Sequence, residues 1–327
     1  MQIQMSTDSI DTVVQGLIGA CDVAGGPTDE QYIVIQALVS HLWHQPELDV
    51  RSVSGLGPNE LAVALVNPID RQRFHEFLVC IEACRHPLTK AQVARVEQYE
   101  MALGINGPDM ALFRSMVDAG AARAKADFAR FLSASIPDRS EPSLQQMVVD
   151  AEQPEPELVA RLEQLADCAS GTLGHAYIKF YERSQLTLPG VEASGLNHFY
   201  VAHDMTHVIA GIDTTAQAEI ALSAFQMAMN DDSINRSALL ASLIVHEAGF
   251  GDSNKVRAEQ QILARPGAAD LLATEMDRGR RCSADFSRID HLGIADVPLT
   301  EVREQFGVLR PADPNDGQHI FWEPLGS

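Results

Sequence analysis

The chain has 327 residues, of which 46% are hydrophobic and 21% are charged. It is long and apolar enough for two domains with buried cores, which excludes a disordered chain. Its 24 Lys and Arg against 45 Asp and Glu give a formal net charge of −21 at pH 7. Such a surface argues against a nucleic-acid partner and against electrostatic docking to an anionic membrane, since both need clustered basic groups.

The sequence shows no targeting or membrane-spanning pattern. Its first residues, MQIQMSTDSIDTVV, lack a basic stretch followed by an apolar run, and we find no 18 uninterrupted apolar residues. The five cysteines are odd in number and fit no disulfide framework, which is typical of a reducing compartment. We therefore expect a cytoplasmic protein, whose contact with a membrane would be peripheral and apolar.

Amphipathic helices follow one another through the first half of the chain. The spacing of apolar residues predicts helices at 10–24, from Thr28 onward, at 71–84, at 90–105 and at about 109–132. Thr89 with Gln92 three residues later has the spacing of a capping box. Alternating β-branched residues with hairpin turns are scarce, so a large sheet is not expected.

A polar, proline-containing stretch over 133–157 is the predicted boundary between two helical domains. The sequence thus predicts an all-α protein with a first domain at 1–135, a linker at 136–157 and a second domain at 158–327.

The first half of the chain resembles the helical TerB-like (tellurite-resistance) domain. The resemblance rests on its short amphipathic helices, ending in LTKAQVARVEQYEMALGI at 88–105. The acidic Asp-Gly-Glu segment of that family corresponds here to 22–30, where the pattern is eroded. The resemblance implies a helical accessory or dimerisation domain, so a homodimer is one expected assembly.

The second half contains a candidate metal-binding pattern. His203 and His207 are four residues apart, so on a helix they share one face and can bind one metal ion through imidazole nitrogens. Asp204 can add a carboxylate oxygen or can accept a hydrogen bond that orients an imidazole.

Glu219 can join this pattern only if the helix is broken. On one continuous helix, twelve residues at about 1.5 Å each would place it about 18 Å beyond His207. Gly211 suits a helix C-cap and Thr214 suits a helix N-cap. A second helix from about residue 215 would then fold back antiparallel and present Glu219 from its second turn. Such a hairpin predicts one divalent metal ion, either zinc or iron, with manganese or cobalt as further candidates.

This segment resembles the HDxxH-x11-E motif of the coenzyme Q (ubiquinone) biosynthesis protein 4 family. Upstream, GTLGHAY at 171–177 is similar to the GTLGxxY segment of that family. Downstream, RGR at 278–280 and DVPLTEVREQFGV at 296–308 are similar to its closing segment, so the resemblance covers about 158–310. Two positions depart from the family pattern: Tyr200 stands where Arg is usual, and Ala218 where Gly is usual. The first change removes a cation beside the metal and puts the substrate of the family in doubt.

The resemblance implies a mononuclear site at His203, Asp204, His207 and Glu219, and an apolar groove for a polyprenyl tail. Members act in ubiquinone synthesis, with a role in oxidative decarboxylation and hydroxylation at ring carbon 1 of the prenylated benzoate. They have also been regarded as scaffolds for the other biosynthetic enzymes, which are the expected protein partners.

We therefore predict a metal-dependent protein acting on a prenylated or quinone-like aromatic substrate, and we favour an enzyme of lyase or oxidoreductase type. One alternative is a tailoring enzyme that uses the same metal site on another lipophilic secondary metabolite. The other is a non-catalytic, lipid-binding scaffold.

Aromatic residues cluster before the motif, and most are expected to pack in the core. Tyr177 and Tyr200 are the predicted substrate-binding residues, because a phenol can face a polar ring while its body stays apolar. Two further motifs are weaker. His246-Glu247 begins like HExxH but lacks the second His. His203-Asp204 also resembles HD-type phosphohydrolases, which need another upstream His and a distant Asp.

Overall fold

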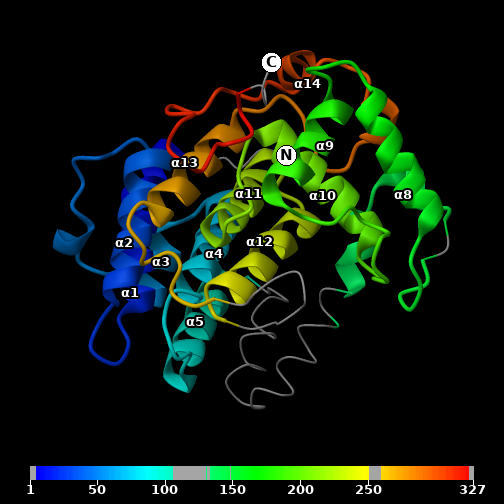
Figure 1. Cartoon of the computed structure of the whole chain (residues 1–327). Coiled ribbons are helices and arrows are strands. Elements are labelled where there is room, and N and C mark those ends of the chain that lie inside the picture. Colours follow the sequence, from blue (N-terminus) through cyan, green and yellow to red (C-terminus); the bar gives the residue numbers. More distant parts are fainter. Residues whose placement is uncertain (1–4, 106–129, 131–132, 148, 250–258, 324–327) are drawn as a thin grey trace. The chain divides into compact units, whose positions relative to one another are not determined.

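The computed structural model describes residues 5–105, 130, 133–147, 149–249 and 259–323. These residues form helices and loops, and the only β-type pairings among them are two isolated bridges, Thr172 with Pro298 and Ala248 with Gln260. The predicted all-α class is therefore confirmed (Figure 1). The helix predicted at 109–132 lies almost entirely outside the described residues.

The chain forms two compact units, and the first is discontinuous in sequence. The first unit contains residues 1–132 and 223–280, and the second contains 133–222 and 281–327. This division differs from the predicted one, which assigned one continuous half of the chain to each domain. Part of the predicted linker is packed into the second unit, where the buried carboxylate of Glu141 lies 2.8 Å from His291 Nδ1.

The first unit is a set of short helices around an apolar core. Capping boxes at Thr28 with Gln31 and at Thr89 with Gln92 begin two of them, as the sequence predicts for the second. Phe74 and Tyr99 lie together in the core with ring centroids 5.8 Å apart. The helices are α1 (Ile10–Cys21), α2 (Asp29–Ala37), α3 (Pro58–Ala64), α4 (Pro68–Glu82), α5 (Lys90–Leu103), α12 (Ser233–His246) and α13 (Ala268–Arg280).

The second unit is built around a buried central helix, α10. Arg303 holds the C-terminal end of α10, because its guanidinium donates hydrogen bonds to the carbonyl oxygens of Val208 (3.0 Å) and Ile209 (2.9 Å). The helices are α8 (Pro156–Glu163), α9 (Leu173–Ser184), α10 (Asn197–Ala210) and α14 (Leu299–Phe306). The start of α11 (Ala216–Met229) also belongs to this unit.

Among the described residues, no helix combines the length and the apolar character that crossing a membrane requires.

Candidate metal centre

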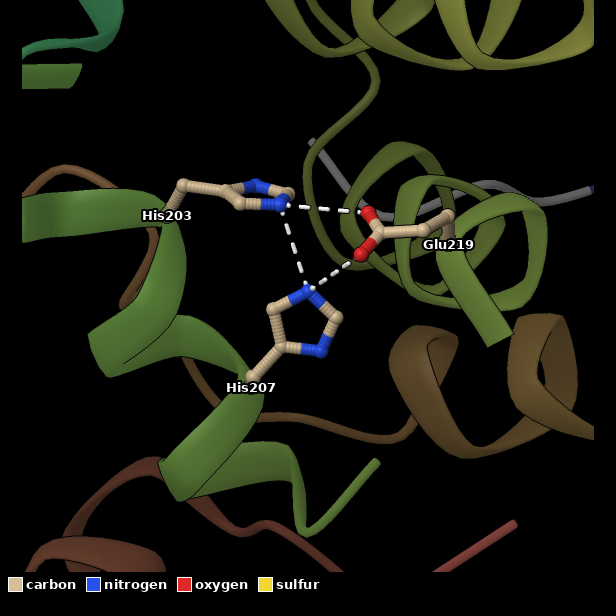
Figure 2. Close-up of side chains that lie close together, drawn as sticks. All are labelled: His203, His207 and Glu219. Carbon is tan, nitrogen blue, oxygen red and sulfur yellow. Dashed lines mark hydrogen bonds and ion pairs between the residues drawn. The ribbon is translucent and has the colours of Figure 1, made fainter. Parts of the chain in front are cut away.

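Two histidines of α10 and a carboxylate of α11 converge on one point (Figure 2). The Nε2 atoms of His203 and His207 are 3.2 Å apart. Glu219 reaches between them, with Oε2 3.2 Å from His203 Nε2 and Oε1 3.3 Å from His207 Nε2. Three such atoms around one point have the spacing of ligands to a single ion.

The break between α10 and α11 brings Glu219 to the histidines, and it begins at Gly211, as the sequence predicts. Gly211 ends α10 with a φ of 81°, in the left-handed region that favours glycine. The Thr215 hydroxyl then accepts a hydrogen bond from the Ala218 amide near the start of α11. Glu219 lies in the first turn of α11 rather than the predicted second turn, because the helix begins at Ala216.

Neighbouring groups fix the orientation of both imidazole rings. His207 directs Nδ1 toward the carbonyl oxygen of Ile212 at 3.2 Å, so its Nε2 faces Glu219. The ring of Phe199 stacks on His203 with centroids 5.1 Å apart. Within the described residues, Nδ1 of His203 has no hydrogen-bond partner. The side chains of His207, His203 and Glu219 are 0%, 12% and 21% exposed, so the group is reached from the side of Glu219.

The charges of His207 and Glu219 stabilise each other. Burial alone would lower the pKa of His207, but the negative charge of Glu219 and the hydrogen bond with it raise that pKa. Burial alone would raise the pKa of Glu219, but the two histidines lower it well below its usual range. The carboxylate is therefore ionised at neutral pH and can act as an anionic ligand. Two imidazoles and one carboxylate suit zinc, iron, manganese or cobalt and would leave coordination positions open.

Asp204 points to a different partner. Its buried carboxylate accepts a hydrogen bond from the Tyr181 hydroxyl, and it is not in the group formed by the two histidines and Glu219. Burial raises the pKa of Asp204, while His203 and the Tyr181 hydrogen bond lower it. The structure thus pairs Asp204 with Tyr181, and its role as a direct ligand stays a prediction.

The two predicted substrate-binding tyrosines occupy different environments. Tyr177 is fully buried, and its hydroxyl lies 3.5 Å from that of Tyr181. Tyr200 is partly exposed, and its ring centroid lies 5.5 Å from that of Phe199. Tyr200 and His203 thus contact the same Phe199 ring, and the substrate role of both tyrosines stays a prediction.

Arg139 is a neighbour of the site that sequence reasoning missed. Its guanidinium carbon lies 4.7 Å above the ring centroid of Phe199, the same ring that stacks on His203. Burial and then the charge of Arg288 lower the pKa of Arg139 to about 10, while Glu219 acts in the opposite direction. In the part of the chain that the structure describes, this guanidinium forms no ion pair or hydrogen bond. No sequence signal marks it, because it lies 64 positions before His203.

A separate cavity of about 880 Å³ is present in the second unit. It is lined by residues of α9, α14 and the C-terminal segment, among them Lys179, Arg303 and Trp322. His203, His207 and Glu219 do not line it, so the structure does not join this cavity to the candidate metal centre. The predicted groove for a polyprenyl tail therefore stays a prediction.

Fold and site together define an all-helical protein with a candidate centre for one metal ion. Residues 151–247 match the family model described as Coenzyme Q (ubiquinone) biosynthesis protein Coq4. This match includes α10 and the motif through Glu219, so this segment of the chain is similar to that family. The match does not extend to the first half, so the TerB-like resemblance there stays a prediction.

One solved structure is similar to this chain at low identity. It is the crystal structure of a candidate ubiquinone biosynthesis protein from Nostoc punctiforme PCC 73102. The two chains are 20% identical over 73% of this chain and 99% of that chain, with a TM-score of 0.32. A TM-score of this size does not establish a common fold. No curated protein matches the chain.

Proposed function

We propose that this protein holds one divalent transition-metal ion with His203, His207 and Glu219 and acts in ubiquinone biosynthesis on a prenylated aromatic acid. The observation that carries the proposal is the convergence of these three side chains within the segment that matches the family. They lie on two helices, and a glycine-ended break between the helices brings them together.

The reaction we propose replaces a ring carboxyl group by a hydroxyl group. The carboxyl group leaves as carbon dioxide, one atom of dioxygen enters the new hydroxyl group, and the other leaves as water with two electrons and two protons from a reductant. A redox-active metal ion such as iron would supply the oxidative chemistry, whereas zinc would act only as a Lewis acid. The role of the protein is to orient the acid and to exclude water from the ring.

Arg139 is the residue that we propose binds the carboxylate of the substrate. Its guanidinium rests on the Phe199 ring next to His203 and has no anionic partner among the described residues. An arginine in such a position can bind a carboxylate through two parallel hydrogen bonds. It would supply a cation near the metal centre, where Tyr200 has replaced the arginine that is usual in the family.

The first test is metal content. Inductively coupled plasma mass spectrometry on the full chain should find about one ion per chain that is lost in His207→Ala and in Glu219→Gln. His175→Ala changes a histidine on α9 outside the group and should keep the ion. An unchanged metal content in the first two variants would overturn the proposed site.

The second test is turnover. The metal-loaded protein should release carbon dioxide from a prenylated hydroxybenzoate in the presence of dioxygen and a reductant, and His207→Ala should not. A bound zinc ion without turnover would instead favour the non-catalytic scaffold.

The second candidate function is that of a tailoring enzyme for another lipophilic secondary metabolite. Tyr200 favours this function, because this residue changes the surroundings of His203 relative to the usual arginine. In that case the metal content would be the same, and the prenylated hydroxybenzoate would not be turned over.

A further inference from the structure

A second group of potential ligands lies within the first unit. Glu30 is on α2, His86 lies in the loop after α4, and Glu247 follows the last residue of α12. One ligand atom from each lies within 4.8 Å of the others. His86 Nε2 is 2.7 Å from Glu247 Oε1 and 3.9 Å from Glu30 Oε2. Ligands bound at about 2.1 Å in a tetrahedron are about 3.4 Å apart, a spacing between these two values.

The two carboxylates are buried without a compensating lysine or arginine among the described residues. Glu30 is 7% exposed and Glu247 is 0% exposed. Within the described residues, neither forms an ion pair with a lysine or an arginine, and His86 is their shared partner. Buried carboxylates are unfavourable unless they are paired or bind a metal ion, so ionising both glutamates would leave this group with an excess of negative charge.

One oxygen atom in the group has no hydrogen-bond partner among the described residues. Glu247 already uses both oxygens, Oε1 with His86 and Oε2 with the Leu263 amide at 2.8 Å. Glu30 Oε1 is buried and forms no hydrogen bond within the described residues, and the backbone of Ala264 lies near the Glu30 carboxyl group and lowers its pKa. Glu247 is thus held in one orientation beside the Glu30 oxygen that forms no hydrogen bond. A cation bound between the two glutamates would give that oxygen a partner.

A proton is the competing occupant of this space. Burial and then the charge of Glu247 raise the pKa of Glu30 to about 8, so a neutral Glu30 could donate a hydrogen bond to Glu247. A divalent cation neutralises both carboxylates, whereas one proton neutralises only one. The imidazole of His86, an ordinary ligand of transition metals, also favours the cation.

We propose that Glu30, His86 and Glu247 form a second binding site for a first-row divalent cation of the zinc or manganese class. The cation would cross-link α2, the loop after α4 and the end of α12. It would thereby join the two stretches of sequence that make up the first unit. Its role would be to stabilise this unit, and the site is independent of the proposed function.

The test counts zinc ions bound to the full chain after chelation and dialysis against Zn²⁺, by inductively coupled plasma mass spectrometry. The unmodified chain should bind two ions, Glu30→Gln one, His207→Ala one and the double variant none. Glu82→Gln is the matched control, because Glu82 is an equally buried glutamate of the same unit that contacts Cys21 instead of His86. It should bind two ions.

A single zinc ion that His207→Ala abolishes and Glu30→Gln retains would overturn the second site and favour the shared proton. A single ion with the reverse dependence would support the second site and overturn the metal centre of the proposed function.

A measurement of thermal stability distinguishes the loss of a zinc site from a failure of the variant to fold. In the His207→Ala background, Zn²⁺ should raise the Tm by several degrees, and adding Glu30→Gln or Glu247→Gln should remove that rise. Both are isosteric changes, and circular dichroism checks that the variants are folded. An equal rise in Tm with and without these changes would contradict the proposal.

Discussion

At the scale of single residues, the proposed role of Arg139 is to bind the carboxylate of the substrate beside the candidate metal centre. Replacing it by Leu should raise the KM for an aromatic acid about 10- to 100-fold, because a hydrogen bond to a charged group contributes about 1.5–3 kcal/mol. The kcat should change less, and the metal content should not change. Steady-state kinetics on Arg139→Leu and Arg139→Lys, with the matching neutral aromatic as a second substrate, would measure this. An equal loss on both substrates would contradict the role in carboxylate binding.

Glu82 gives a pH-dependent prediction within the first unit. Burial raises its pKa from 4.5 to about 7. The protonated form is therefore favoured in the folded state, and the folded protein loses stability as the pH rises from about 4.5 to 7. One pKa unit corresponds to about 1.4 kcal/mol, so ionising this group costs up to about 3 kcal/mol.

Glu82→Gln imitates the protonated form and should raise the free energy of unfolding at pH 8 while leaving it nearly unchanged at pH 5. Urea unfolding at both pH values measures the difference. A gain of the same size at pH 5 would show that ionisation of Glu82 is not the cause.

At the scale of elements, the C-terminal end of α10 depends on one side chain from α14. Arg303 bonds to the carbonyl oxygens of Val208 and Ile209 in α10 and to those of Phe321 and Trp322. Helix C-termini leave carbonyl groups without intrahelical partners, and a buried cation there is favourable.

Arg303→Leu should lower the free energy of unfolding by about 2–4 kcal/mol, because four buried carbonyls lose a charged donor. It should also weaken metal binding, since His207 lies one residue before Val208 in α10. Chemical denaturation and zinc titration would measure the two effects. Arg183→Leu, which removes one exposed bond to the Ile320 carbonyl, is the control and should cost less than 1 kcal/mol. Equal losses in both variants would contradict the role of Arg303.

Local signals in the sequence predicted several elements well, because each depends on only a few neighbouring residues. The capping box at Thr89 and the end of α10 at Gly211 lie where the pattern places them, and α11 begins one residue after the predicted start. These signals also indicated that Glu219 would meet the two histidines. Glu219 lies in the first turn of α11 and not in the predicted second turn, because the starts of helices vary by a residue or two.

Features that depend on distant packing could not be predicted in this way. Arg139 reaches the site from far upstream, and its position depends on the stacking of Phe199. Asp204 can serve as a ligand or as an acceptor, and the choice depends on where the Tyr181 hydroxyl lies. The return of 223–280 to the first unit has no local signature, because helices of either unit show the same apolar spacing.

At the scale of the whole molecule, the net charge of −21 acts on stability rather than on any one site. Like charges repel one another most strongly in the compact state, and salt screens that repulsion. The Tm should therefore rise by a few degrees between about 10 and 300 mM NaCl at pH 7.5. The rise should nearly vanish near pH 4.8, where the sequence pI lies. Calorimetry at both pH values checks this, and a Tm that falls with salt at pH 7.5 would contradict it.

Because the first unit is discontinuous in sequence, it constrains both folding during synthesis and the design of truncated variants. A ribosome releases residues 1–132 long before it releases α12 and α13, which pack on α4 and α2. The core of the first unit therefore stays incomplete in the nascent chain while the segment with the candidate metal centre is synthesised. A fragment that ends at residue 135 should aggregate, because the faces of α4 and α2 that α12 and α13 cover would be exposed to solvent. Deleting residues 1–135 would in turn expose the opposite faces, so neither truncation isolates a working half.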